Sequence, residues 1–165
     1  MTGNQPSELD GLKAKRMAPH MMEASAPPLF LAPMAGVTDL AYRILARECG
    51  ADLTVTEFTA ASGLTRKNTY SWLKVESDPR ESPFIPQIFG GITEEMVQTV
   101  EMLQDRADVI DINFGCPAPK VCRNDAGAAL LRDPDRVVSM VRACIDATEV
   151  PITVKMRLGT GSGPN

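Results

Sequence analysis

The stretch that decides how this chain folds is Val109-Ile110-Asp111-Ile112-Asn113-Phe114-Gly115-Cys116-Pro117. Its first four residues are apolar apart from one aspartate, which predicts a buried strand over 109–112. The glycine and the proline break regular structure, so Cys116 falls in a loop at the carboxyl end of that strand. In parallel α/β folds this edge carries the ligand site. We therefore interpret Cys116 as a candidate functional residue rather than as a small buried hydrophobe.

Short apolar runs alternate with helical patterns on both sides of this stretch. Strands are predicted at 29–32, 52–57, 84–88, 109–112 and 151–156. Helices are predicted from a cap at Thr38 or Asp39 to Gly50, from a cap at Thr93 to about Arg106, and after a cap at Asp133 with Pro134 in the first position, with shorter helices near 60–64 and 71–74. This alternation indicates a parallel α/β sheet.

Two α/β architectures fit the alternation of strands and helices. One is an open, five-stranded, doubly wound sheet, and the other is the first part of an eight-stranded (β/α) barrel, which normally needs about 250 residues. Both place their ligands at the carboxyl ends of the strands. Four polar residues fall at or near such ends: Glu57, Gln87, Asn113 and Lys155.

The composition is that of one soluble domain. The chain has 165 residues, 44% of them hydrophobic, and its 17 basic and 21 acidic side chains give a net charge of −4. This balance argues against a protein whose whole surface binds nucleic acid. The sequence shows neither a signal-peptide pattern nor an apolar run of the roughly 18 residues that a membrane span needs. We therefore expect a cytoplasmic protein without a membrane partner.

The cysteines and the single histidine do not suggest a metal site. The four cysteines form no C-x-x-C pair, and His20 is the only histidine, so no metal is expected. Cys49 and Cys144 fall in predicted helices, where a cysteine is usually a small buried hydrophobe. For Cys122 we expect a structural role.

Four motifs, in this order, are similar to those of one enzyme family. They are Leu31–Asp39 (LAPMAGVTD), Pro86–Gly90 (PQIFG), Asp111–Pro117 (DINFGCP) with Lys120 and Gly127–Leu131 (GAALL) behind it, and Thr153–Gly159 (TVKMRLG). Over about residues 29–159 the chain resembles the tRNA-dihydrouridine synthases.

This resemblance implies an FMN-dependent oxidoreductase on a (β/α)8 TIM barrel, with a helical C-terminal domain that helps to hold tRNA. The implied reaction reduces the 5,6 double bond of particular uridines in tRNA, with NADPH as the reductant that recharges the flavin. Hydride from reduced FMN goes to C6, and Cys116 protonates C5. A cysteine thiol is mostly protonated at neutral pH, so it can act as a general acid toward a carbanion or enolate.

The resemblance also implies which residues contact the flavin. Pro33, Met34 and Ala35 would lie against the isoalloxazine ring, which suits backbone groups and a soft thioether. Gln87 would form a hydrogen bond with the polar edge of the ring, since an amide both donates and accepts. Lys155 would place its ammonium near the N1/O2 edge and stabilise the anionic reduced form.

Other residues are expected near the substrate. Asn113 is expected to contact the substrate base or the flavin. Arg157 is expected to reach the same opening of the site or to contact a tRNA phosphate. For Glu57 a structural hydrogen-bonding role and a functional role both remain open. Arg66 and Lys67 belong either to a tRNA-facing loop or to a solvated charged loop.

The resemblance divides the chain into three parts. We expect a flexible leader over 1–28, the N-terminal part of an FMN-binding barrel over 29–159 with about the first five βα units, and a disordered tail over 160–165 at which the barrel is cut. The alternatives are an FMN oxidoreductase like dihydroorotate dehydrogenase, which acts on a free pyrimidine, and an inactive fragment that acts only as a binding module.

Overall fold

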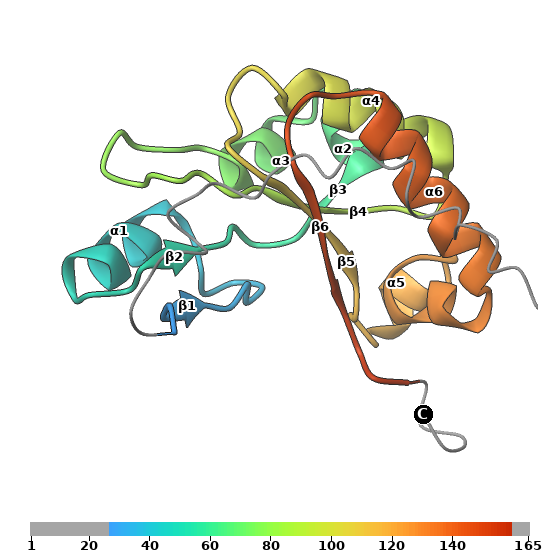
Figure 1. Cartoon of the computed structure of the whole chain (residues 1–165), viewed down its shortest axis with the longest axis horizontal. Helices are drawn as coiled ribbons and strands as arrows, with labels where there is room; N and C mark the ends of the chain where they lie inside the picture. The colour runs from blue at the N-terminus through green and yellow to red at the C-terminus, as the bar shows by residue number, and fades with distance from the viewer. Residues whose placement is uncertain (1–26, 160–165) are drawn as a thin grey trace, which may run out of the picture.

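The computed structural model describes residues 27–159, in which helices pack on parallel strands (Figure 1). The strands are β1 (Phe30–Leu31), β2 (Leu53–Thr54), β3 (Thr59–Ala60), β4 (Gln87–Phe89), β5 (Ile110–Phe114) and β6 (Ile152–Met156). The helices are α1 (Leu40–Glu48), α2 (Ala61–Thr65), α3 (Thr69–Lys74), α4 (Thr93–Leu103), α5 (Pro119–Cys122) and α6 (Pro134–Asp146), with the 3-10 helix η3 (Gly127–Arg132) between the last two. The expected leader up to residue 26, with His20, and the expected tail over 160–165 lie outside the described residues.

All strand pairs are parallel, and neighbouring strands follow the order of the chain. β1 pairs with β2, while β3, β4, β5 and β6 form a four-stranded sheet. A single bridge between Val55 and Ile85 links the segment after β2 to the segment before β4. The described strands therefore lack the reversal of order that defines a doubly wound sheet. The parallel α/β fold predicted from the sequence is confirmed.

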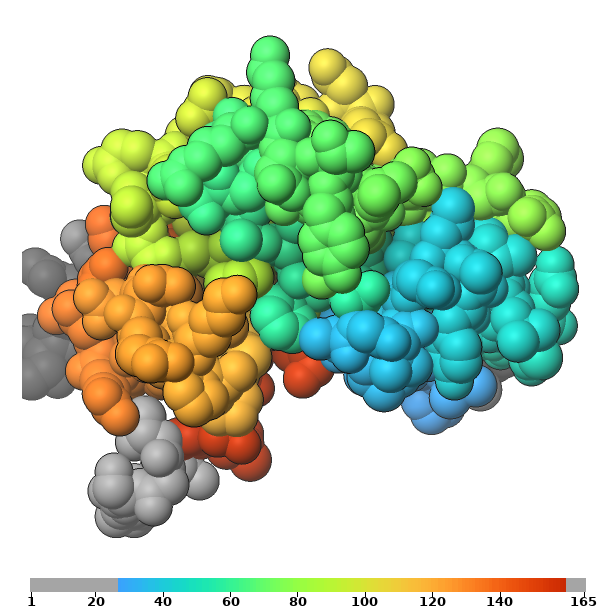
Figure 2. Space-filling model, turned by 180° about the vertical axis from the view of Figure 1, so that it is seen from behind, coloured from blue at the N-terminus to red at the C-terminus, as the bar shows by residue number. Residues whose placement is uncertain are grey.

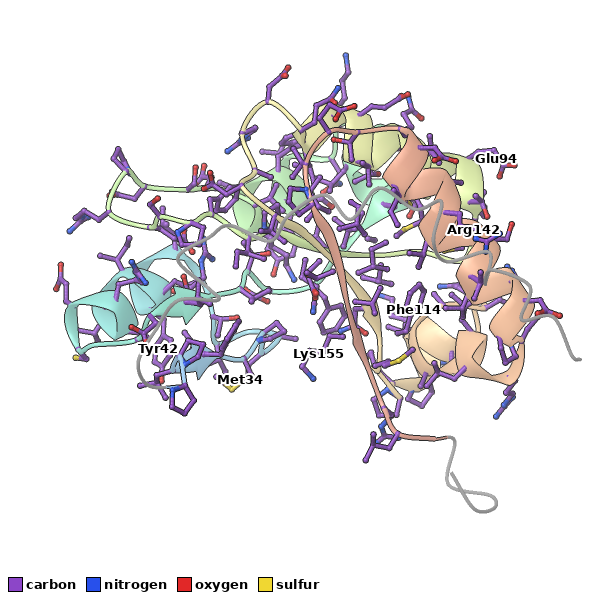
Figure 3. All side chains as sticks on the ribbon, in the orientation of Figure 1. Met34, Tyr42, Glu94, Phe114, Arg142 and Lys155 are labelled. Atoms are coloured by element: carbon purple, nitrogen blue, oxygen red, sulfur yellow. The ribbon has the colours of Figure 1, made fainter. Side chains whose placement is uncertain are left out.

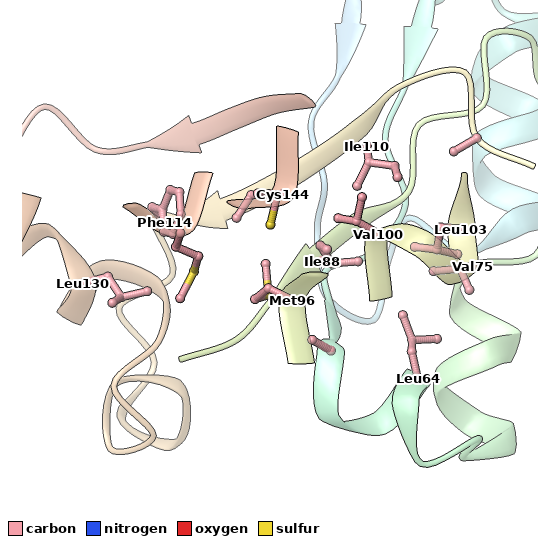
Figure 4. Close-up of a cluster of buried hydrophobic side chains, with 14 of the residues drawn as sticks. Leu64, Val75, Ile88, Met96, Val100, Leu103, Ile110, Phe114, Leu130 and Cys144 are labelled. Carbon is pink, nitrogen blue, oxygen red and sulfur yellow. The ribbon is translucent and has the colours of Figure 1, made fainter. Parts of the chain in front are cut away.

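The apolar core lies between the four-stranded sheet and its helices (Figure 4). Ile110, Ile112 and Phe114, which are alternate residues of β5, are fully buried in it. The helices contribute Met96, Val100 and Leu103 from α4, and Met140 and Cys144 from α6. Each such side chain contributes roughly 1.5–3 kcal/mol by leaving water.

Two sequence-based boundaries were wrong. The strand predicted over 52–57 is interrupted and continues as β3, and the offset between paired residues falls from 30 at Val55–Ile85 to 29 at Thr59–Ile88. One extra residue therefore lies between the pairs, as in a β-bulge. Thr93 was expected to cap a helix, but it is the first residue of α4, and Ile92 in the cap position makes no side-chain capping bond.

Two helix caps were predicted correctly. The Asp39 carboxylate accepts a hydrogen bond from the N–H of Tyr42 at 2.9 Å, at the start of α1. The Asp133 carboxylate accepts one from the N–H of Arg136 at 3.1 Å, and a proline takes the first turn of α6. Each cap satisfies a backbone donor that the helix itself leaves without a partner.

A buried ion pair fastens α1 to the rest of the chain. Arg43 of α1 bonds through two guanidinium nitrogens to both carboxylate oxygens of Glu81, and both residues are nearly inaccessible. The guanidinium also donates to the carbonyls of Thr38 and Glu76, at 2.9 and 2.7 Å. The hydroxyl of Thr54 in β2 donates to Glu81 at 2.9 Å. These bonds join α1, β2 and the loop before β4.

Replacing Arg43 with methionine should lower the free energy of unfolding by about 3–5 kcal/mol, because it leaves the Glu81 carboxylate buried without its cation. The matched control is Arg80→Met, which removes an exposed ion pair with Asp78. Water screens that pair, so the control should leave the urea midpoint nearly unchanged. Equal losses in the two variants would contradict this account of α1.

Candidate active site

One face of the four-stranded sheet carries polar side chains. In β5, Asp111 and Asn113 alternate with the core residues and therefore point to the opposite face. Gln87 of β4 and Thr153 of β6 are register partners of Asp111, and Lys155 is the register partner of Asn113. Register partners in parallel strands share a face. The three strands β4, β5 and β6 thus build one polar surface.

Hydrogen bonds connect these side chains in a row. Thr153 Oγ1 donates to Asp111 Oδ1, and Gln87 Nε2 donates to Asp111 Oδ2, both at 2.6 Å. Asn113 Nδ2 donates to Gln87 Oε1 at 3.0 Å. Burial raises the pKa of Asp111 above its ordinary value, although the bonds from Gln87 and Thr153 and the charge of Lys155 act against this rise. Within residues 27–159, every buried side-chain nitrogen and oxygen has a hydrogen-bond partner.

The row ends at the backbone of the Cys116 loop. Asn113 Oδ1 accepts hydrogen bonds from the N–H of Gly115 at 3.1 Å and of Cys116 at 2.9 Å. On the other side, the N–H of Ala128 donates to the Cys116 carbonyl at 2.9 Å. Gly127 has a φ of 59°, and a Cβ there would lie 2.7 Å from the same carbonyl oxygen. The loop is therefore fixed from both sides, with its thiol partly exposed.

The turn after β1 is tied to the segment between β2 and β3. This turn contains the expected flavin-contact residues 33–35, and Met34 is 39% exposed. The N–H of Gly36 donates to Glu57 Oε2 at 2.6 Å, and Lys74 donates to the same oxygen at 3.2 Å. Of the two roles left open for Glu57, the structure supports the structural one.

The carboxyl end of β6 lies beside the Cys116 loop. A Cβ at Gly115 would lie 3.6 Å from Arg157 Cγ and 3.7 Å from the carbonyl oxygen of Lys155. Both Lys155 and Arg157 are exposed. Figure 3 shows the side chains of Lys155 and Met34 extending away from α2, α3 and α4, on the same side of the molecule.

A cleft of about 920 Å³ opens at the carboxyl ends of β3 and β4. Its charged lining consists of Arg66, Lys74, Lys120, Arg136, Glu95 and Asp125. In Figure 2, the green surface of α2 and α3 faces the orange surface that follows β5 across this region. Tyr70, which is 68% exposed, also lines the cleft. Because cations outnumber acids and an aromatic ring is exposed, the cleft suits an anionic ligand with flat groups.

The structure brings together the expected residues of β4, β5 and β6. Gln87 bonds directly to Asn113, which holds Cys116, and Lys155 is in register with Asn113. Gln87 is fully buried, with each end of its amide already bonded to a side chain. Residues 33–35 belong to the turn after β1, which is bonded to Glu57 through the N–H of Gly36.

Sequence reasoning missed two members of the polar row. Asp111 and Thr153 each lie two residues before a residue that was chosen, Asn113 and Lys155 respectively. The two-residue period of a strand places each pair on the same face. That alternation was the available signal.

The other cysteines differ in their surroundings. Cys144 is fully buried, which confirms the prediction of a buried hydrophobe, and this burial raises the pKa of its thiol to about 11. The same prediction was wrong for Cys49, which is exposed because it lies one residue past the end of α1. Cys122 Sγ donates to the Cys116 carbonyl at 3.6 Å, a structural contact.

The described part of the chain has neither a metal-binding cluster nor a membrane-spanning helix. Between residues 27 and 159 there is no group of three His, Cys, Asp or Glu side chains placed to hold a metal ion. No helix in that range has the length and apolar character to cross a membrane.

Two glycine substitutions should separate backbone strain from steric contact at the Cys116 loop. Gly36 has a φ of 73° and open space where a Cβ would stand, so Gly36→Ala should cost about 1 kcal/mol of unfolding free energy. Gly127→Ala adds contacts at 2.7 Å to Cys116 and 2.8 Å to Val121. It should therefore cost about 1–3 kcal/mol more, measured by urea unfolding. Equal losses of unfolding free energy in the two variants would show that steric contact with the Cys116 loop adds nothing at Gly127.

Comparisons with known proteins agree with this geometry. The family model described as "Dihydrouridine synthase (Dus)" matches residues 30–163. A "Probable tRNA-dihydrouridine synthase" of Rhizobium leguminosarum bv. phaseoli is 42% identical over 130 residues, which are 78% of this chain and 41% of the relative. The "tRNA-dihydrouridine synthase B" of Pseudomonas aeruginosa is 42% identical over 135 residues, 79% of this chain and 40% of the relative. The chain thus spans about two fifths of the length of these curated relatives. It belongs to the dihydrouridine synthase family.

Proposed function

We propose that this protein reduces the C5=C6 bond of uridine in tRNA, in the cytoplasm, with FMN as cofactor and NADPH as reductant. The observation that carries the proposal is the loop after β5, in which the side chain of Asn113 holds the backbone of a partly exposed Cys116. The relatives named above are all tRNA-dihydrouridine synthases by name. That match favours tRNA over the free pyrimidine of a dihydroorotate-dehydrogenase-like enzyme.

We further propose that residues 29–159 form about the first five βα units of a (β/α)8 TIM barrel. The parallel pairing in chain order supports this architecture. In it, β2 and β3 are two halves of one barrel strand, interrupted at the extra residue near Glu57. The polar face of β4, β5 and β6 then points into the barrel.

The residues present fit a bound flavin. The exposed Met34 and Ala35, with Pro33, offer apolar groups to a flat ring, and the exposed ammonium of Lys155 offers a positive charge to its polar edge. Gln87 keeps one N–H beyond its bond to Asp111, because an amide nitrogen carries two. When bound, FMN supplies the hydride that C6 of the uracil ring accepts.

In this proposal Cys116 holds the proton that C5 receives. Its loop is fixed by side-chain and backbone bonds, so the backbone that carries the thiol is held in place before the substrate arrives. Asn113 and Arg157 are the residues expected to contact the uracil ring or its nucleotide. The cationic cleft, which adjoins the same strand ends, would receive tRNA phosphates and unpaired bases.

Replacing Cys116 with alanine should lower the rate of dihydrouridine formation by about 10²–10⁴-fold, because the general acid is lost. The assay counts dihydrouridine by nucleoside analysis of tRNA that lacked it at the start. Cys49→Ala, at the exposed end of α1, is the matched control and should keep the parent rate. Full activity of Cys116→Ala would refute the acid role, and the visible flavin absorbance of both variants tests whether the cofactor stays bound.

Reversing the charge of Lys120 should weaken tRNA binding about fivefold or more, and should reduce by about one the slope of log affinity against log salt. Arg142→Glu is the control, because Arg142 is exposed on α6 and does not line the cleft. Binding is measured by filter retention or fluorescence anisotropy at several salt concentrations. If both variants lose the same affinity, the effect is one of net charge and the cleft is not the tRNA surface.

A further inference from the structure

The polar row on the inner face of the sheet has a defined direction. At one end stands the Asp111 carboxylate, whose two oxygens accept hydrogen bonds from Thr153 and Gln87 at 2.6 Å each. Both oxygens of Asp111 are acceptors in these bonds, so the side chain of Gln87 turns its nitrogen toward Asp111, which leaves its oxygen toward β5.

The orientation of Gln87 in turn fixes Asn113. Because Gln87 Oε1 is an acceptor, Asn113 presents its Nδ2 to it, at 3.0 Å. The carbonyl oxygen of Asn113 then faces the opposite way, where it accepts from the N–H groups of Gly115 and Cys116. Two amide groups that could each be reversed without a change of shape are thus held in one orientation.

We propose that Asp111 is a positioning residue, which acts through Gln87 and Asn113 to hold the backbone of Cys116. Asp111 accepts on both oxygens, so the amide of Gln87 meets an acceptor on that side and turns its nitrogen toward it. The consequence for uridine reduction rests on the proposed function, whereas the row of bonds does not.

The proposal predicts what Asp111→Leu does to the row. Leucine offers no acceptor, so Gln87 Nε2 loses its partner, and Asn113 is no longer held with its oxygen on the N–H groups of Gly115 and Cys116. Hydrogen exchange of these two amides should become about fivefold faster or more, the factor that corresponds to the loss of one ordinary hydrogen bond. The Ala128 amide, bonded to the other side of Cys116, is the internal reference.

A second substitution should restore the orientation by moving the carboxylate one position along the row. In the double variant Gln87→Glu/Asp111→Leu, the introduced carboxylate offers an acceptor to Asn113 Nδ2 with either of its oxygens. Exchange at Gly115 and Cys116 should return to within about twofold of the parent. Thr153→Val is the matched control, because it removes a bond to Asp111 but leaves Asp111 an acceptor toward Gln87, so exchange at both amides should stay within about twofold.

Three results overturn the proposal: unchanged exchange in a folded Asp111→Leu chain, no recovery in the folded double variant, or an equal rise in Thr153→Val. If the variants do not fold, NMR measurements on the parent chain test the proposal. Couplings across hydrogen bonds are expected from Asn113 Nδ2 to the Gln87 amide carbonyl, and from the Cys116 amide to the Asn113 side-chain carbonyl. Their absence, or the reversed orientation, refutes the relay. None of these measurements needs turnover, so a failure of the proposed function is recognised separately.

Discussion

The two-residue period of β5 is the constraint on which the rest of the structure depends. Ile110, Ile112 and Phe114 must face the helices, because they fill the core beneath α4 and α6. Asp111 and Asn113 are thereby forced onto the opposite face. A shift of one residue in register would place a carboxylate in the apolar core, at a cost of several kcal/mol. The packing of the helices therefore also decides where the polar row forms and where the Cys116 loop begins.

Once the polar face is formed, carboxylates join the segments that contribute to it. Asp111 connects β4 to β6 by accepting from Gln87 and Thr153. Glu57 accepts from Gly36 and Lys74, and so connects the turn after β1 to α3. Apolar packing is not directional, whereas these bonds fix orientation as well as distance. Directional bonds suit a surface that must present its groups to a ligand at defined angles.

The sequence predicted what depends on neighbours in the chain and missed what depends on register. The start of α6 was predicted because an aspartate cap and a proline stand together. The break between β2 and β3 was missed, because β-branched residues run through it and the Glu57 contacts that accompany it come from distant segments. Cys116 was chosen from its position after a strand. Thr153 was missed because its partner, Asp111, is 42 residues away and meets it only through strand pairing.

In the proposed function Cys116 reacts with the substrate, and such a group must be held to within about 0.5 Å, yet Cys116 lies on a loop. Neighbouring segments, which include Gly127 and Ala128, pack closely against this loop and hold it. The Cys116 carbonyl accepts from the N–H of Ala128 and from Cys122 Sγ, and Gly127 approaches so closely that a Cβ would collide with that carbonyl. The positive φ of Gly127 permits this approach at little cost, since glycine adopts it freely. The segment Gly127–Leu131 thus has a physical reason to accompany Cys116: it supplies the support that a strand would otherwise provide.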